Sequence, residues 1–316
     1  TVLTLSNGIK VVLKHTDFKK DEIQMTATSP GGSTLFGNKD IDNLKVFNEV
    51  IELGGLGNFS ATDLGKMLAG KKVSCSTSLG LDSENVNGSS TPSDLKTLFE
   101  LIYLSFTAPR MDEEAYASFE NRMKAQLKNL ELNPMVAFSD SLTKAIYNNN
   151  PRAMRIDPAD FKNISYPRIM EMYKERFGDA SGFVFTFVGN IDTDSIRPLV
   201  EQYLATLPAN GKIEQGNPKE VPAIRKGDYV NRFKRQMETP KASVVNFYSG
   251  QMDYNLENIV TATMLKQVLD LIYTEKVRED EGGTYGVQTS ARISSFPEGQ
   301  TFLQAYFDTD PDKREK

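Results

Sequence analysis

The sequence predicts an α/β fold of two units, each a mostly antiparallel sheet with helices packed on it. The chain has 316 residues, and domains usually divide above about 250 to 300 residues, so two cores are expected. A strand, a helix and two strands follow one another between Ile23 and Ser90, and the same order returns between Ala242 and Phe307. Pro and Gly gather in residues 208–228 without a hydrophobic period, as in a connector between domains.

The first unit opens with a predicted hairpin. Leu3 to Leu5 and Ile9 to Leu13 flank Asn7-Gly8, a dipeptide favoured in two-residue turns because both central residues need positive φ. Apolar residues alternate from Ile23 to Ala27, which predicts a third strand. Leu44 to Ile51 then shows apolar residues three and four apart, the spacing of an amphipathic helix.

Capping signals divide the rest of this unit. Ser60 with Asp63 is typical of a capping box, and two strands follow at Val73 to Leu79 and Glu84 to Ser90. Thr91-Pro92 is a cap and first position of the next helix. Further helices are predicted over residues 112–131, 134–147 and 166–177.

A β-prone run from Phe183 to Val188 predicts a central strand covered on both faces, and Asp192 caps a helix after it. The predicted boundaries are therefore a first domain at residues 1–207, a linker at 208–228 and a second domain at 229–316. The second domain stops where the first continues into a run of helices, so we expect it to be truncated. Because the chain begins at Thr1, without Met or a leader, we expect an internal fragment of a longer protein.

Composition excludes several classes of function. The 37 basic and 42 acidic residues give a net charge of −5, and the Lys pairs are isolated, which argues against nucleic-acid binding. The longest apolar run is too short for a membrane-spanning helix. His15 is the sole histidine, so the chain cannot supply a two-histidine zinc site. His15 is expected at the end of a surface strand, and Cys75, the sole cysteine, in a buried strand.

Three stretches resemble the M16 (pitrilysin/insulinase-type) zinc metallopeptidases. Residues 5–12, Leu-Ser-Asn-Gly-Ile-Lys-Val-Val, look like the entry hairpin of the family. Residues 183–192, Phe-Val-Phe-Thr-Phe-Val-Gly-Asn-Ile-Asp, are similar to its buried strand and Gly-x-Ile/Val-Asp turn. Residues 277–287, Val-Arg-Glu-Asp-Glu-Gly-Gly-Thr-Tyr-Gly-Val, look like its Arg-Glu-x-x-Gly-x-x-Tyr segment. Their order, their spacing and the repeated architecture together cover nearly the whole chain, and the resemblance implies a half made of two similar α/β domains.

One departure from the family pattern decides which half this is. Catalytic halves carry an inverted His-x-x-Glu-His motif on the helix after the opening strands, and the matching helix, Asn43 to Leu53, has no histidine. Glu49 and Glu52 on it are expected to be a solvated face. The resemblance thus implies the C-terminal, non-catalytic half, with no catalytic residue and no metal ligand of its own.

The resemblance also implies the partners and the site. Zinc and its catalytic glutamate would come from an N-terminal M16 catalytic half, and the two halves would enclose a peptide substrate. Arg278 and Tyr285 match the residues that C-terminal halves of the family offer to the substrate. Without the resemblance, Arg278 would complement the negative end of its helix and Tyr285 would pack in a strand.

Two functions remain open at this point. One is the substrate-chamber half of a zinc metalloendopeptidase that degrades peptides or unfolded polypeptides, inactive as a fragment. The other is a non-catalytic structural or assembly subunit of the same fold. Residues upstream of Thr1 would discriminate between them. The compartment is not set by the sequence, although the long single-chain members that it most resembles suggest a bacterial periplasm or cell envelope.

Overall fold

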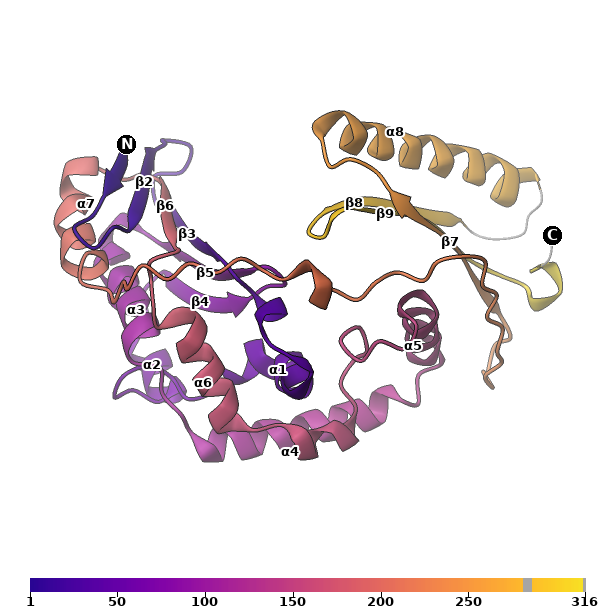
Figure 1. Ribbon diagram of the computed structural model, residues 1–316, viewed down its shortest axis with the longest axis horizontal. Helices are drawn as coiled ribbons and strands as arrows, with labels where there is room; N and C mark the ends of the chain where they lie inside the picture. The colour runs from indigo at the N-terminus through magenta and orange to yellow at the C-terminus, as the bar shows by residue number, and fades with distance from the viewer. Residues whose placement is uncertain (281–285, 315–316) are drawn as a thin grey trace. The chain divides into compact units, whose positions relative to one another are not determined.

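The computed structural model describes residues 1–280 and 286–314, and the side chains of all of these except 278–280. It confirms the predicted α/β class. The chain packs into two compact units (Figure 1). Unit 1 comprises Thr1–Lys128 and Arg155–Glu220, and unit 2 comprises Asn129–Met154 and Val221–Lys316.

Unit 1 contains most of the regular elements. Its strands are β1 (Val2–Thr4), β2 (Lys10–His15), β3 (Ile23–Pro30), β4 (Val73–Leu79), β5 (Ser83–Ser90) and β6 (Val184–Gly189). Its helices are α1 (Ile41–Val50), α2 (Ala61–Met67), α3 (Leu95–Thr107), α4 (Glu113–Leu130), α6 (Tyr166–Phe177) and α7 (Thr193–Leu199), and the last two residues of α4 belong to unit 2. The predicted strands and helices of this unit are all present.

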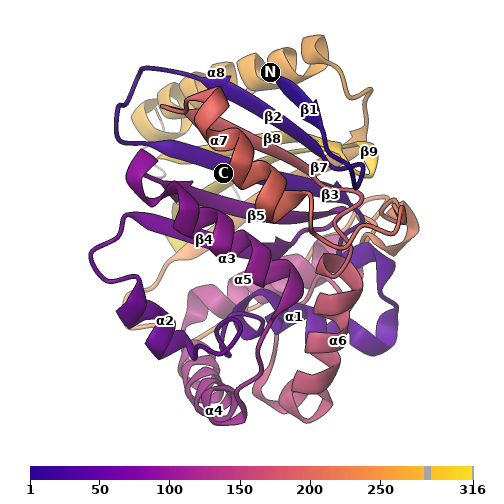
Figure 2. The ribbon, with the colours of Figure 1, turned by 90° about the vertical axis from the view of Figure 1, so that its left-hand side faces the viewer.

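The six strands form one sheet in the order β1-β2-β6-β3-β5-β4. Every neighbouring pair is antiparallel except β2 and β6, which run parallel with Val11 opposite Phe185. Figure 2 shows α3 and α7 lying against one face of this sheet. The core fills the space beneath the helices, where Phe99 of α3 stacks on Phe187 of β6 with ring centroids 5.0 Å apart.

The prediction that β6 is covered on both faces is wrong. Phe185 and Phe187 are fully buried, whereas Val184 and Val188 are exposed. The strand does lie inside the sheet, between β2 and β3, but among the described residues of unit 1 helices cover only one side of it. A run of β-prone residues therefore indicated a central strand, while its alternation with period two shows which face is buried.

The opening hairpin is present, but its turn differs from the predicted two-residue type. β1 and β2 pair with Thr4 opposite Lys10, so the connection is longer, and only Gly8 has positive φ, at 85°. The Asn7 side chain instead donates hydrogen bonds to the carbonyl oxygens of Leu204 and Leu207, at 2.9 and 3.1 Å. Asn7 thus ties the hairpin to the end of the helix after β6.

Gly189 ends β6 and shows why a glycine is required there. Its φ is 143°, and a Cβ at this position would lie 2.2 Å from the Glu22 carbonyl oxygen. We expect Gly189→Ala to lower the free energy of unfolding of unit 1 by about 2 kcal/mol or more. Gly65 is the control, because it lies in α2 with nothing within 4 Å, and Gly65→Ala should stabilise by up to about 1 kcal/mol. Urea titration of both variants measures this, and equal effects would contradict it.

The first part of the predicted linker is bound to unit 1. Asn217 donates its backbone N–H to Thr34 Oγ1 at 3.0 Å, and Gly211 donates to Ser181 Oγ at 2.7 Å. Glu214 pairs with Arg176 of α6. Residues 208–220 therefore pack as a strap on unit 1, and the connector proper begins only after Glu220.

Unit 2 is built on a three-stranded antiparallel sheet of order β7-β9-β8. Its strands are β7 (Ala242–Gln251), β8 (Val287–Ser295) and β9 (Glu298–Thr309), and its helices are α5 (Pro134–Tyr147) and α8 (Leu256–Tyr273). The predicted boundaries put α5 in the first domain, whereas it packs in unit 2. Phe138 of α5 meets the ring of Tyr306 in β9 at 6.2 Å, and Met135 contacts Ser243 of β7.

Candidate functional site: an uncovered sheet face and the segment after α8

The two residues that the sequence assigned to the substrate lie after α8. Arg278 falls in a π-helical turn, Thr274–Asp280, that continues α8, and the backbone there is described while the Arg278 side chain is not. Tyr285 lies outside the described residues, two positions before β8 begins at Val287. The role assigned to each of them stays a prediction.

By the resemblance noted in the sequence, helix α1 matches the helix on which catalytic halves of the M16 family carry their zinc motif. Its inward positions four residues apart are Val46 and Val50, and both are buried in the core. Glu49 is exposed. Two valines offer no atom that can bind a metal, so this helix does not fit a zinc ion.

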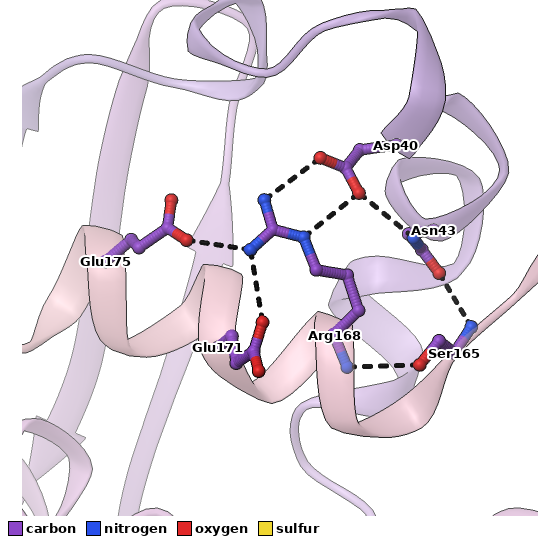
Figure 3. A network of polar contacts seen from close by, with 6 residues as sticks. All are labelled: Asp40, Asn43, Ser165, Arg168, Glu171 and Glu175. Carbon is purple, nitrogen blue, oxygen red and sulfur yellow. Dashed lines mark hydrogen bonds and ion pairs between the residues drawn. The ribbon is translucent and has the colours of Figure 1, made fainter.

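A polar network fixes the start of α1 against α6 (Figure 3). Arg168 of α6 donates from Nε to Asp40 Oδ1 at 3.1 Å and from Nη2 to Asp40 Oδ2 at 3.0 Å. Its Nη1 meets Glu171 at 3.3 Å and Glu175 at 2.8 Å. Most of the donors of this guanidinium are therefore used within the fold, and we assign Arg168 to architecture rather than to substrate binding.

Asp40 is the buried partner in this network. Its side chain is 4% exposed, whereas that of Arg168 is 26% exposed. Burial tends to raise the pKa of the Asp40 carboxyl, but the hydrogen bonds and charge of Arg168, with help from Asn43, outweigh it and lower that pKa below its usual 3.8. Asp40 is therefore ionised at neutral pH, and Arg168 is the main group that favours its charged form.

A second group of titratable side chains surrounds Cys75 on β4. Burial raises the pKa of Cys75 to about 12, a hydrogen bond from Ser105 opposes this, and the charge of Glu52 adds to it. The Tyr173 hydroxyl, whose pKa burial also raises, donates to the Ser105 carbonyl oxygen at 2.8 Å. A thiol with such a pKa stays protonated at neutral pH, so Cys75 is a structural residue and not a nucleophile.

The remaining candidate for chemistry is His15. It is the last residue of β2 and is exposed, as predicted, and its Nδ1 lies 2.8 Å from the Ile191 carbonyl oxygen. Within residues 1–280 and 286–314, no group of three or more His, Cys, Asp or Glu side chains could hold a metal ion.

A candidate surface is the face of the six-stranded sheet opposite α3. Sheet register aligns its outward positions in rows across the strands. Neutral polar side chains are the most numerous in these rows, and three valines, Val12, Val184 and Val188, lie on the same face. The polar residues are Gln24, Thr26, Thr28, Ser74, Ser76, Ser78, Asn85, Asn87, Ser89 and Thr186. Thr28 donates to Asn85 at 3.2 Å and Ser74 meets Ser89 at 2.9 Å. Among the described strand residues on this face, only Lys10 and Lys14 of β2 are charged.

Reasoning from the sequence did not single out this face, although its signal was present. Ser74, Ser76 and Ser78 alternate with partly or fully buried residues along β4, and the polar residues Gln24 to Thr28 do the same along β3. The alternation served to predict strands, but the shared chemistry of the outward residues was not considered. Hydroxyl and amide groups can each donate and accept hydrogen bonds, so this face can bind a peptide backbone without requiring a particular charge.

The chain matches a known family over its second half. Residues 163–316 fit the family model described as "Peptidase M16 inactive domain". Two curated relatives, the probable zinc proteases PqqL of Haemophilus influenzae and Escherichia coli, are each 22% identical to this chain over 90% and 95% of its length. Residues 163–316 therefore belong to the M16 peptidase family. The resemblance seen in the three sequence stretches is thereby confirmed, and the chain contains the inactive domain of the family.

Solved structures share the fold of this M16 chain. The periplasmic protease PqqL of Escherichia coli superposes on 99% of the chain with a TM-score of 0.83 at 19% identity. An M16 inactive domain of Pseudomonas fluorescens covers 98% of it with a TM-score of 0.70 at 16% identity. The chain spans about a third of the length of the curated relatives that it matches, 30% and 32%, and 34% of the PqqL structure.

Within the described residues, no helix is both long enough and apolar enough to cross a membrane.

Proposed function

We propose that this M16 chain forms one wall of the substrate chamber of a zinc metalloendopeptidase that degrades peptides or unfolded polypeptides. Zinc and the catalytic glutamate belong to an N-terminal M16 half of the same protein. The relatives named as zinc proteases support this, since the chain matches about a third of each of them. By itself the 316-residue chain is inactive, because α1 carries Val46 and Val50 where a metal would need ligands.

The uncovered face of the unit 1 sheet carries this proposal. An unfolded polypeptide presents backbone N–H and C=O groups at regular intervals, whatever its sequence. Rows of hydroxyl and amide groups can satisfy those backbone groups, and the scarcity of charge avoids selecting for one type of substrate. A surface meant for one folded partner would instead be expected to carry buried apolar anchors.

Arg278 and Tyr285 are proposed as the residues that this half brings to the reacting peptide. Arg278 supplies a fixed positive charge and several N–H donors, which suits holding substrate carbonyl groups in register. Tyr285 is a neutral hydroxyl donor for the carbonyl oxygen on which negative charge develops. The bond-breaking chemistry itself is assigned to the other half. A periplasmic or cell-envelope location is proposed, because the Escherichia coli relative is a periplasmic protease.

Placing a charge at the centre of the uncovered face tests the proposal. Thr26 pairs with both Asn87 and Thr186 there, so Thr26→Arg in the complete protein should obstruct peptide binding. We expect kcat/KM for an unfolded polypeptide to fall about tenfold, the effect of about 1.4 kcal/mol of lost binding, with an unchanged melting temperature. Ser93→Arg, at the exposed turn before α3, is the control and should leave kcat/KM unchanged.

Two outcomes would count against the proposal. If Thr26→Arg and Ser93→Arg had the same kinetics, the sheet face would not contact substrate. If the wild-type complete protein bound no zinc and cleaved no peptide, the chain would belong to a structural or assembly subunit of this fold.

A further inference from the structure

The uncovered face of the unit 1 sheet has two chemically different halves. On β3, β5 and β4 its outward side chains are hydroxyls and amides. On β1, β2 and β6 lysines and valines predominate, and Thr4 and Thr186 are the hydroxyl residues among them. The members of this lysine–valine half are Val2, Lys10, Val12, Lys14, Val184 and Val188.

Strand register places each lysine beside a valine. In the parallel pair of β2 and β6, Lys10 lies opposite Val184 and Lys14 lies opposite Val188. Val12 lies between the two lysines on β2. Neighbouring strands are about 4.8 Å apart, so the aliphatic stem of each lysine runs next to a valine side chain. Positive charge and aliphatic surface therefore alternate over this half.

The valines of this half remain open to solvent. Val184 is 40% exposed, Val188 is 36% exposed and Val2 is 68% exposed. The inward residues of the same strand, Phe185 and Phe187, are fully buried. A partner that covered the valines would gain hydrophobic free energy, because their surface is not yet removed from water.

The two lysines give this half a local positive charge. Both side chains are exposed, and within the described residues neither ammonium group pairs with a carboxylate. Glu22 lies just before β3, but its carboxylate accepts hydrogen bonds from Lys19 at 2.6 Å and from Gln24 at 2.8 Å. Glu84 of β5 is turned into the core and is 1% exposed. The face is thus locally basic, although the whole chain has a net charge of −5.

The spacing of the two lysines matches an extended peptide. Lys10 and Lys14 are four residues apart on one strand, a distance of about 13 Å at the usual rise per residue. An extended peptide turns every second side chain to the same side, so its residues i, i+2 and i+4 would face the sheet together. Carboxylates at i and i+4 would then meet the two lysines, and an aliphatic residue at i+2 would meet Val12.

We propose that the lysine–valine half is a subsite for extended polypeptide segments with the pattern acidic-x-aliphatic-x-acidic. This inference rests on the proposed function and gives its substrate a preferred chemistry. The two carboxylates pair with Lys10 and Lys14, and the aliphatic side chain packs among Val12, Val184 and Val188. The hydroxyl and amide half binds the neighbouring backbone without regard to charge. Complementary charge in the subsite thus selects which segment of an unfolded polypeptide is held there.

Peptide binding to the complete protein tests the subsite. Fluorescence anisotropy would be measured on labelled peptides in the presence of a chelator, so that no peptide is cut. The acidic peptide is Gly-Ser-Glu-Ser-Val-Ser-Glu-Ser-Gly, and the basic peptide has lysine at both glutamate positions. We expect the acidic peptide to bind about tenfold more tightly at low salt, the combined effect of two exposed ion pairs. The preference should shrink in about 1 M salt, which screens exposed charges. Equal affinities at low salt would overturn the proposal.

A double lysine variant with a matched control locates the binding. Lys10→Gln with Lys14→Gln should weaken binding of the acidic peptide about tenfold, with an unchanged melting temperature. The control is Lys66→Gln with Lys96→Gln, which changes the net charge equally on α2 and α3, where these side chains are 75% and 66% exposed. We expect the control to bind the acidic peptide as the wild type does. Equal losses in the two variants would show a general charge effect and overturn the subsite.

A peptide of the same composition tests the spacing. In Gly-Ser-Ser-Glu-Val-Glu-Ser-Ser-Gly the glutamates are two residues apart, and the valine turns to the opposite side from them. We expect this peptide to bind at least about threefold more weakly than the acidic peptide, because one ion pair and the valine contact are lost. Equal affinity would overturn the proposed pattern. Equally strong competition by an oligothymidylate of the same charge would make the site a general anion site and would also overturn it.

Failure of the subsite can be told apart from failure of the proposed function, because binding is measured without cleavage. If the complete protein cleaved unfolded polypeptides but bound the acidic and basic peptides equally, only the subsite would be disproved. If it preferred the acidic peptide but bound no zinc and cleaved nothing, the peptidase would be disproved and the subsite would stand.

Discussion

Replacing Arg168 with methionine is expected to lower the free energy of unfolding of unit 1 by about 3 kcal/mol. The guanidinium makes two hydrogen bonds to Asp40, whose carboxylate is almost completely buried. Without Arg168 that carboxylate is left buried and unpaired, and removing one partner of such a pair commonly costs about 3 to 5 kcal/mol. The lower end of this energy range applies here because Arg168 is itself partly exposed to solvent.

Hydrogen exchange of α1 and α6 amides in increasing urea measures this effect in unit 1 alone. Glu171→Gln is the control, because Glu171 is mostly exposed and meets only the outer nitrogen of the same guanidinium. We expect that variant to change stability by less than about 0.5 kcal/mol. If Arg168→Met were no more destabilising than Glu171→Gln, the network would not contribute to the stability of unit 1.

The same pair sets an acid dependence whose sign follows from the pKa of Asp40. That pKa is lowered in the folded state, so the unfolded chain binds the proton more readily. The stabilisation is fully present above the ordinary value of 3.8 and is lost as the pH falls through the lower folded value. The stability difference between wild type and Arg168→Met should therefore shrink in that acidic range.

Tyr285→Phe in the complete protein is expected to lower kcat by about 10² to 10³, under the proposed function. Removing one well-placed donor to a developing oxyanion costs about 2.7 to 4 kcal/mol of transition-state stabilisation. Phenylalanine keeps the ring and removes only the hydroxyl, so zinc content and melting temperature should be unchanged. Arg278→Ala should mainly lower kcat/KM, because its proposed role is to orient the substrate.

Steady-state kinetics on several peptides measures both effects. Tyr254→Phe is a matched control, since Tyr254 precedes α8 in the same unit and is exposed. Wild-type kinetics for Tyr285→Phe and Arg278→Ala would disprove the assignment. Loss of zinc or of folding in these variants would make the two residues architectural instead.

Local signals in the sequence were sufficient for most elements of the fold. Ser60 accepts the Asp63 N–H at 3.1 Å as the capping pattern predicted, and Thr91 caps the turn before α3. Such signals act within one turn of a helix, so they can be recognised without knowledge of the rest of the chain. The turn at Asn7 was predicted wrongly because its side chain serves a helix end that is 197 residues away in the sequence.

The placement of α5 and the covering of β6 were beyond these local patterns. Apolar residues show that a helix such as α5 has a buried face, but they do not say which sheet buries it. Likewise, the run from Phe183 to Val188 is β-prone throughout, and only the structure shows that Val184 and Val188 are left uncovered. The proposed roles of Arg278 and Tyr285 came from family resemblance, because their chemistry is shared by many structural Arg and Tyr residues.

The chain path through α5 has a mechanical consequence. The polypeptide leaves unit 1 after Lys128, returns at Arg155 and leaves again after Glu220, so three covalent connections join the units. A single protease cut after Glu220 would leave α5 covalently attached to the N-terminal fragment. The contacts of α5 with the rest of unit 2 would keep the C-terminal fragment bound to it. Among these contacts, Arg225 Nε donates to the Ala145 carbonyl oxygen at 2.6 Å. A nicked molecule would thus migrate as one particle under native conditions and separate into two fragments only on denaturation.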